Sequence, residues 1–167
     1  MAYKGRYIVE NTKKYAGDPS NVVYRSLWEL HCFKYCDSNP KVKKWSSEEI
    51  VVPYWYDIDK KYHRYYPGLK IVFEDKTILV EIKPAKETTP PTKQGKNKKR
   101  YIGEATTYVK NMNKWQAANA FCKDRKWEFQ IWTEDTLQSM GIMAKPLKKV
   151  PGKLKPLKPY RKPKKKL

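Results

Sequence analysis

The sequence predicts an α+β domain of mixed α/β character, built as a helix, a three-stranded antiparallel meander, a second helix and a fourth strand. Three observations predict this class. Residues 22–37 and 104–125 contain no glycine or proline and are long enough to form helices. Between them lie three segments rich in β-branched and aromatic residues, separated by short polar turns. An alternating pattern at 127–132 follows the second helix and indicates another strand.

The first helix follows an N-terminal segment, residues 1–20, which ends in the loop sequence Gly-Asp-Pro-Ser. Ser20 or Asn21 can accept a hydrogen bond from the first turn of a helix. The helix is therefore predicted to span 22–37, and the Ser-Asn-Pro sequence after it marks its end.

The meander consists of segments 45–54, 63–73 and 77–83. The turn sequence Asp-Ile-Asp-Lys at 57–60 joins the first two segments, and Glu-Asp-Lys at 74–76 joins the second to the third. The second helix is expected to pack on this sheet. A short last helix is expected to start at the Thr-Glu-Asp-Thr sequence that follows the final strand.

Two basic segments interrupt or follow the domain, which is expected to span 21–144. Residues 84–100 are polar, basic and broken by prolines, which predicts a mobile loop. Residues 145–167 contain 11 lysines and arginines, no acidic residue and five prolines. Because proline at this density excludes helix and sheet, this segment is predicted to be a disordered, extended, basic Pro/Lys-rich tail.

The net charge is strongly positive, with 37 basic and 17 acidic residues and a formal value of +20. Both the domain and the tail carry an excess of positive charge, which favours a polyanionic partner. Nucleic acid is the favoured partner, and its binding should weaken steeply with salt because each neutralised phosphate releases counterions. A ribosomal protein and a membrane-surface protein share these electrostatics and stay open as alternatives.

Neither a membrane span nor a secretory signal is visible, so the chain is expected to work in a cytoplasm. The three cysteines, Cys32, Cys36 and Cys122, do not suggest a disulfide framework. His31 precedes Cys32, but no second pair of ligands follows at metal-binding spacing. Buried free thiols are therefore expected.

The end of the third predicted strand carries two residues that suit phosphodiester cleavage. Alternation in 77–83 places Glu81 and Lys83 on one face, side by side. On a solvent-exposed face this pair would be an ordinary surface choice, and that alternative stays open.

A second carboxylate, Glu29, lies on the apolar stripe of the first helix, with Cys32, Phe33 and Cys36 at helical spacing. A carboxylate in such a place is costly unless it is paired or bound to a cation. A salt bridge to Arg25, four residues earlier, is one explanation. The other is that two acids and a lysine jointly hold a divalent ion and an attacking water.

Three motifs in order make a more specific pattern: Ser-x-Trp-Glu at 26–29, His-Arg-Tyr-x-Pro at 63–67 and Glu-Ile-Lys-Pro at 81–84. With them the chain resembles the TnsA-like branch of the PD-(D/E)xK nuclease superfamily over roughly 20–132. Within that branch it is similar to the head completion nucleases of T-even bacteriophages. The resemblance implies a restriction-endonuclease-like core and a nuclease-like domain.

The resemblance also implies a Mg²⁺-dependent endodeoxyribonuclease, with Mn²⁺ as a possible substitute, acting in phage head completion and DNA packaging. Glu29 and Glu81 match the metal ligands, and Lys83 matches the lysine that orients the water and stabilises charge on the phosphate. The remaining ligand of the family is an aspartate, whose position falls on Gly68. These four positions are the candidate catalytic residues, and cleavage by this chain is expected to be severely impaired.

Three explanations for Gly68 are open: an inactivated variant, replacement of the ligand by a neighbouring acid, or loss of cleavage with retention of DNA binding. The acids in the flanking turns are Asp57, Asp59, Glu74 and Asp75. None of these alternates into the Gly68 position, so replacement by them is not expected.

Candidate DNA contacts are basic residues near this site. Arg64 is expected to share a face with Gly68 and to reach the scissile phosphate, whereas His63 could equally be structural. Lys114 and Gln116 are candidate auxiliary groups. The expected phosphate-binding residues of the loop are Lys93, Lys96, Lys98, Lys99 and Arg100.

The expected partner is double-stranded DNA, and no membrane is expected. The tail could bind DNA nonspecifically or dock onto capsid portal or neck proteins, and both alternatives stay open. The expected location is the host cytoplasm during phage assembly, or association with the virion. The alternative function is a non-catalytic head completion factor that binds DNA ends or the portal. The sequence gives no oligomeric state.

Overall fold

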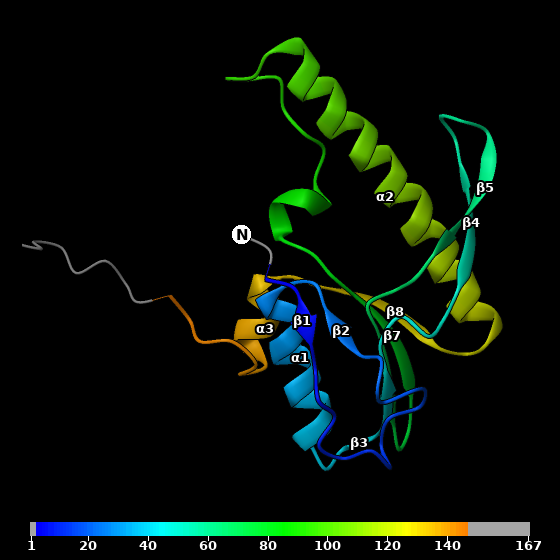
Figure 1. Cartoon of the computed structure of the whole chain (residues 1–167). Helices are drawn as coiled ribbons and strands as arrows, with labels where there is room; N and C mark the ends of the chain where they lie inside the picture. The colour runs from blue at the N-terminus through cyan, green and yellow to red at the C-terminus, as the bar shows by residue number, and fades with distance from the viewer. Residues whose placement is uncertain (1–2, 147–167) are drawn as a thin grey trace, which may run out of the picture.

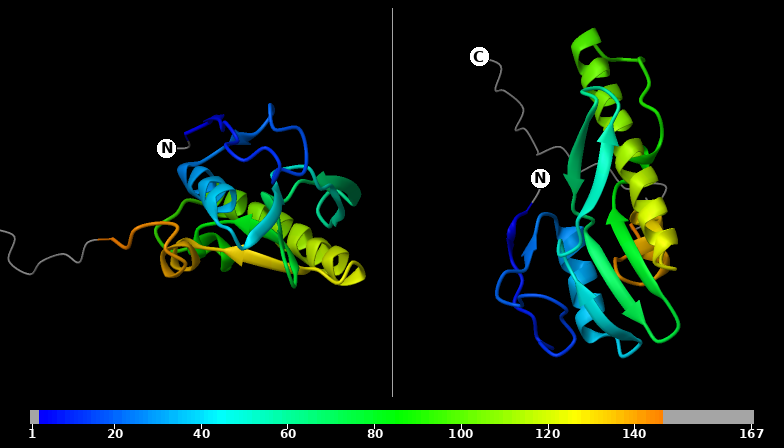
Figure 2. Two further views of the ribbon diagram at one scale, coloured as in Figure 1. Left: turned by 90° about the horizontal axis from the view of Figure 1, so that it is seen from below. Right: turned by 90° about the vertical axis from the view of Figure 1, so that its right-hand side faces the viewer.

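A four-stranded mixed sheet with one long helix on each face organises the chain (Figures 1 and 2). The computed structural model describes residues 3–146, so nearly all of the predicted tail, 147–167, lies outside the described residues. The helices are α1 (Leu27–Ser38), α2 (Lys98–Asp124) and α3 (Glu134–Ser139), with a 3-10 turn η1 (Ala85–Thr88). The strands are β1 (Gly5–Arg6), β2 (Val23–Tyr24), β3 (Val42–Ser46), β4 (Val52–Tyr56), β5 (Lys61–Tyr65), β6 (Leu69–Phe73), β7 (Thr77–Ile82) and β8 (Glu128–Trp132).

The strand order in the main sheet is β3-β6-β7-β8. Strands β3, β6 and β7 pair antiparallel, and β8 pairs parallel to β7. A parallel pair needs a long crossover connection, and α2 supplies it. Helices α1 and α2 therefore lie on opposite faces of the sheet (Figure 2). The predicted α+β class is confirmed.

The first two strands of the predicted meander differ from the prediction, because each is broken in two. The first half of segment 45–54 belongs to β3 and the second half of segment 63–73 belongs to β6, and both strands stay in the main sheet. The other two halves, β4 and β5, form a separate two-stranded hairpin beside α2 (Figure 1). On one side the break falls at Glu48, whose φ of 56° lies in the left-handed region that strands do not use. On the other side it falls at Pro67-Gly68, two residues that weaken a strand. The split lets the hairpin leave the sheet and pack on α2.

Both long helices start elsewhere than predicted. Helix α1 starts after Ser26, whose Oγ accepts a hydrogen bond from the Glu29 backbone N–H at 3.2 Å. Residues 23–24, predicted as helix, form β2, because the N-terminal segment supplies β1 as their partner. Helix α2 starts six residues early, after Asn97, whose Oδ1 accepts from the Arg100 N–H at 2.8 Å. The last three residues of the predicted loop are therefore helical.

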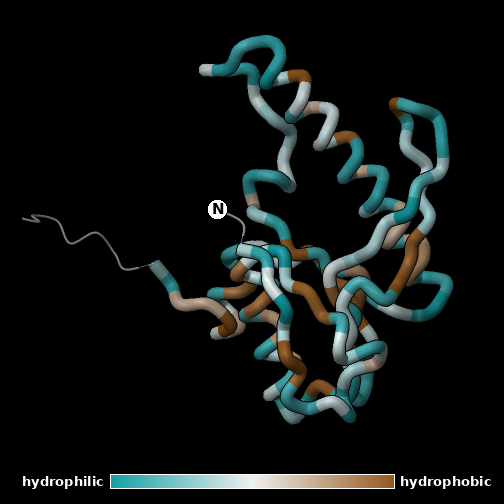
Figure 3. Tube along the Cα trace, in the orientation of Figure 1, coloured by the Kyte–Doolittle hydropathy of each residue, from teal (hydrophilic) through white to brown (hydrophobic). Residues whose placement is uncertain are grey.

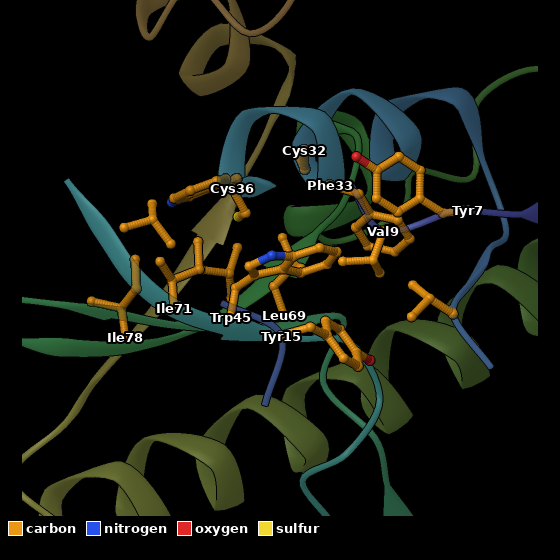
Figure 4. Close-up of a cluster of buried hydrophobic side chains, with 14 of the residues drawn as sticks. Tyr7, Val9, Tyr15, Cys32, Phe33, Cys36, Trp45, Leu69, Ile71 and Ile78 are labelled. Atoms are coloured by element: carbon orange, nitrogen blue, oxygen red, sulfur yellow. The ribbon is translucent and has the colours of Figure 1, made fainter. Parts of the chain in front are cut away.

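Two hydrophobic clusters hold the helices to the sheet. The first lies between α1 and the sheet and includes Trp45, which is fully buried, with the Phe33 ring tilted against it at 5.5 Å between ring centroids (Figure 4). The second joins α2 to the opposite face of the sheet and to the hairpin, through Leu79 and Trp115 among others. The three cysteines are buried and free, as predicted, and burial raises the pKa of Cys32 to about 12.

The N-terminal segment belongs to the first cluster. Tyr7, Val9 and Tyr15 are buried in it, and the backbone around Tyr15 pairs with β3. The carboxylate of Asp37, at the end of α1, accepts hydrogen bonds from the Tyr7 hydroxyl at 2.8 Å and from the N–H groups of Glu10 and Asn11 at 2.7 and 3.1 Å. A single buried acid thus fastens this segment to α1. Among residues 3–146, no helix is long and apolar enough to cross a membrane.

Candidate active site

Strand β7 carries Glu81 near its end, on the face that α2 covers. Ile78 and Val80 point into the first cluster, and Leu79 points into the second. By alternation Glu81 follows Leu79, and only 14% of its side chain is exposed. The Lys83 Nζ lies 3.8 Å from the Glu81 Oε1. The structure therefore places the pair on a covered face, not on an open surface.

Two further residues adjoin Glu81. The Tyr65 hydroxyl donates a hydrogen bond to the Glu81 Oε2. The Lys114 Nζ, from α2, lies 5.4 Å from the centroid of the Tyr65 ring. Burial raises the pKa of Glu81, although the Tyr65 hydrogen bond and the charges of Lys83 and Lys114 oppose this. Burial likewise lowers the pKa of Lys114. The site thus holds charged groups at a cost to the folded state.

Sequence reasoning gave Tyr65 no role, although it lies in the His-Arg-Tyr-x-Pro motif. The signal was its position in β5: it pairs with Val52, and both face α2. Lys114 was predicted to lie near the candidate site, and the structure places its amine over the Tyr65 ring. Gln116 is exposed and, two residues further along the helix, lies on a different side of α2.

Glu29 lies in the first turn of α1, and its Oε2 accepts a hydrogen bond from the Arg25 backbone N–H at 2.7 Å. Burial raises the pKa of Glu29, and the negative charges of Glu48 and Glu81 raise it further. The charge of Glu81 therefore acts on Glu29, although the two residues are far apart in sequence. The proposed salt bridge from the Arg25 side chain is wrong, because that guanidinium binds Glu48 at 2.7 and 3.1 Å.

Glu48 is an acid that sequence reasoning did not consider. It lies at the break between β3 and β4, in a left-handed conformation. Its charge raises the pKa of both Glu29 and Glu81, after the larger effect of burial. The only sequence signal is the polar Ser-Ser-Glu-Glu stretch at 46–49, between two apolar segments.

Gly68 lies directly before β6, and the register places it beside Glu81. Leu69 pairs with Val80, so the next position on each antiparallel strand brings Gly68 opposite Glu81. A Cβ atom at Gly68 would meet only the Val80 carbonyl oxygen, at an ordinary 3.5 Å, and its φ is not in the left-handed region. The backbone therefore accommodates an aspartate here. Directly opposed residues have Cβ atoms about 5 Å apart, so its carboxylate would lie next to Glu81.

The donors at this site are of the kind that Mg²⁺ prefers, but the set is incomplete. Glu29 and Glu81 offer carboxylate oxygens, and Gly68 offers none. One oxygen of each acid already accepts a protein hydrogen bond. Within the described part of the chain, no group of three or more His, Cys, Asp and Glu side chains could hold a metal ion. The described residues therefore supply two candidate carboxylate ligands but not a complete metal site.

Three of the five predicted basic loop residues border a groove between the segment after β7 and the N-terminal half of α2. The groove has a volume of about 1040 Å³, and its lining extends from Pro84, next to Lys83, to Asn111, one turn from Lys114. The chain here is strongly hydrophilic (Figure 3). The basic residues in its lining are Lys86, Lys96, Lys99 and Arg100.

Not all five loop cations are equally available. Lys96 and Arg100 both form ion pairs with Glu104. The Lys93 Nζ lies over the Tyr101 ring, 5.6 Å from its centroid. The other two, Lys98 and Lys99, are exposed in the first turn of α2.

His63 and Arg64 lie on opposite faces of β5. The His63 ring stacks on Tyr54 at 5.6 Å, and its Nε2 lies 2.5 Å from the Asp59 Oδ2. Arg64 is exposed and alternates with Tyr65, so it points away from Glu81. The expectation that Arg64 shares a face with Gly68 is wrong, because the break at Pro67-Gly68 interrupts the alternation.

Comparisons with known proteins agree with this architecture. The family model described as "TnsA-like endonuclease N terminal" matches residues 39–134, from β3 to the start of α3. The chain is also similar to the head completion nuclease of Enterobacteria phage T4, with 39% identity over 149 residues. That alignment covers 85% of this chain and 98% of the phage T4 protein. No solved structure matches the chain.

Proposed function

The chain belongs to the TnsA-like endonuclease family, and from that premise we propose that it is a metal-dependent DNA endonuclease that acts in the completion of a bacteriophage head. Its place of action would be the cytoplasm of the infected host. The similarity to the phage T4 protein, over nearly the full length of that protein, supports the head completion role.

The observation that carries the nuclease proposal is the arrangement around Glu81. The Lys83 Nζ, directly after β7, lies 3.8 Å from the Glu81 Oε1. The charge of Glu81 acts on Glu29 of α1, and Gly68 is opposite Glu81 in the register. Glu29 and Glu81 would hold Mg²⁺ or Mn²⁺, whose part is to activate water and to neutralise charge on the phosphate. Lys83 would place a cation beside the same phosphate.

Catalysis by this chain should be slow, because the third ligand is missing. A metal held by fewer carboxylates binds more weakly and lowers the pKa of its water less. The raised pKa of Glu81 adds to this effect, because protons compete with the metal at higher pH than they would for an ordinary glutamate.

Plasmid cleavage in Mg²⁺ or Mn²⁺ tests the proposal. Gly68→Asp should raise the cleavage rate about 100-fold, which corresponds to about 2.7 kcal/mol. Gly68→Ala is the matched control, because it fills the same space without a ligand, and it should leave the rate at the parental level. Adding Glu81→Gln to Gly68→Asp should abolish the gain. A Gly68→Asp protein that stays inert while it binds DNA would contradict the proposal.

A second candidate function is a non-catalytic factor that binds DNA ends or the portal during head completion. The absence of a three-ligand metal group among residues 3–146 favours it. The same plasmid assay separates the two functions, because only the endonuclease gains activity from Gly68→Asp.

A further inference from the structure

The two faces of the β4–β5 hairpin differ in chemistry. The inner face packs on α2 and buries Tyr54, Tyr56 and Tyr65. The outer face carries Trp55 and Tyr62, which pair across the strands with their ring centroids 5.1 Å apart at 72°. Trp55 is 43% exposed and Tyr62 is 74% exposed. Tyr62 is therefore mostly open to solvent, and Trp55 is partly open.

Exposed apolar side chains are concentrated around this hairpin. Ten large hydrophobic residues are exposed among residues 3–146, and five of these belong to the hairpin or its ends: Val51, Trp55, Ile58, Tyr62 and Tyr66. Such a concentration on one arm is typical of a binding surface and not of scattered exposure.

The charges around the aromatic pair are positive. Arg64, which pairs with Pro53 on the outer face, is exposed, and so is Lys60 in the turn. The acids of the turn are engaged elsewhere. The Asp57 carboxylate accepts from the Asn113 side chain of α2 at 2.9 Å, and Asp59 lies against His63. The surface therefore suits a ligand that is both planar and anionic.

The hairpin is held firmly by its inner face. The Asp57 backbone N–H donates to the Asn113 Oδ1 at 2.9 Å, which ties the turn to α2. The Lys110 Nζ lies 5.0 Å from the centroid of the Tyr56 ring. The outer rings are thus presented on a fixed arm, so little entropy is lost when a ligand stacks on them.

The aromatic pair lies on the strand that leads to the candidate active site, but on its other face. Tyr62 is three residues before Tyr65 in β5, and the Tyr65 hydroxyl contacts Glu81. Alternation turns Tyr62 and Arg64 to the outer face and Tyr65 to the inner face. The aromatic pair is therefore a surface separate from the residues around Glu81.

We propose that Trp55 and Tyr62 form a stacking platform for unpaired bases of DNA, with Arg64 on the adjacent phosphate. Base faces are hidden inside a duplex, so the platform accepts only bases at a frayed end or in a single strand, where aromatic stacking contributes to affinity. The substrate class is therefore DNA with unpaired bases at an end or in a single-stranded segment. This inference rests on the proposed function only for the ligand being DNA.

Fluorescence anisotropy of the full chain in EDTA tests the platform without any contribution from cleavage. Two labelled DNAs with equal numbers of phosphates are compared: a duplex with a single-stranded end, and a fully paired duplex closed at both ends by non-nucleotide linkers. The parent should bind the open-ended DNA about tenfold more tightly. Tyr62→Ala and Trp55→Ala should remove this preference and leave binding to the closed duplex unchanged.

Two controls make the outcome decisive. Ile102→Ala removes a residue of similar exposure, 51%, on α2 outside the platform, and it should keep the preference. Tyr62→Phe keeps the ring and should also keep it. Equal affinity of the parent for both DNAs, or no effect of the alanine variants, overturns the platform. A parental dimer that Tyr62→Ala dissociates would overturn it in favour of a protein interface. Failure to bind either DNA would instead contradict the proposed function.

Discussion

Two carboxylates, the buried Asp37 on one side of the sheet and the half-buried Glu81 on the other, show how this fold separates stability from chemistry. Asp37, on the α1 side, accepts three hydrogen bonds, from the Tyr7 hydroxyl and two backbone N–H groups. Glu81, on the α2 side, accepts one hydrogen bond from Tyr65 and has the Lys83 Nζ at 3.8 Å. The same chemical group is fully partnered in one place and only partly partnered in the other.

The difference indicates that the α1 side of the sheet serves stability and the α2 side carries the candidate active site. The hydrogen bonds to Asp37 join the N-terminal segment to α1. Each of the three donors would be left without a partner if the acid were removed. Burial raises the pKa of Glu81, so the folded state holds this group in its charged form at a cost. A carboxylate kept under such conditions is typical of a functional site.

The largest expected effect is on stability at Asp37. Asp37→Ala should lower the free energy of unfolding by about 3 kcal/mol, because three donors lose their acceptor in a buried setting. Urea denaturation measures this, with Asp75→Ala as the control, since Asp75 is exposed in the turn after β6. A loss at Asp37 as small as that at Asp75 would remove the contrast between the two carboxylates.

Replacement of Glu81 is expected to change the free energy of unfolding in the opposite direction. Because its pKa is raised in the folded state, folding binds the proton more tightly, and stability falls as pH rises through the folded pKa. Glu81→Gln imitates the protonated form, so it should raise the free energy of unfolding by about 1 kcal/mol at pH 8. This gain should vanish below the ordinary glutamate pKa. Urea denaturation at several pH values measures it, and a loss of stability at pH 8 would contradict the interpretation.

A smaller effect with the reverse pH dependence is expected at Lys114. Burial lowers its pKa, so the folded state disfavours the charged amine at neutral pH. Lys114→Met should stabilise the protein by roughly a few tenths of a kcal/mol. The gain should shrink as pH rises from the lowered pKa of folded Lys114 toward the ordinary lysine pKa, and it should vanish above that value, where the unfolded chain also loses its proton. Thermal melts at pH 7 and 11 measure this trend. A gain that grows with pH would show that the charged amine is stabilising.

The fold class and the order of elements could be predicted from the sequence, because helical spacing and strand alternation are local signals. The break in the two long strands could not. Segment 45–54 is polar only at 46–49, and the hairpin separates from the sheet because α2 offers it a surface. The early start of α2 was missed because proline and charge indicated a loop, although lysine and arginine favour helices.

The site was predictable in part. Motif order pointed to Glu29, Glu81 and Lys83, and the register explains why Gly68 matters. Glu48 could not be predicted, since a loop acid becomes a neighbour of the site only once α1 and β3 are packed. The role of Tyr65 required the strand break, which determines that Tyr65 and not Arg64 turns toward Glu81.

Calorimetric titration with Mn²⁺ tests the central claim most directly, namely that Gly68 occupies the position of a missing third ligand in a metal site formed with Glu29 and Glu81. Gly68→Asp should bind Mn²⁺ at least about tenfold more tightly than the parent. Gly68→Ala should match the parent, and Glu81→Gln should remove the gain from Gly68→Asp. Equal Mn²⁺ affinity in the parent and Gly68→Asp proteins, or a gain that survives Glu81→Gln, would contradict the account.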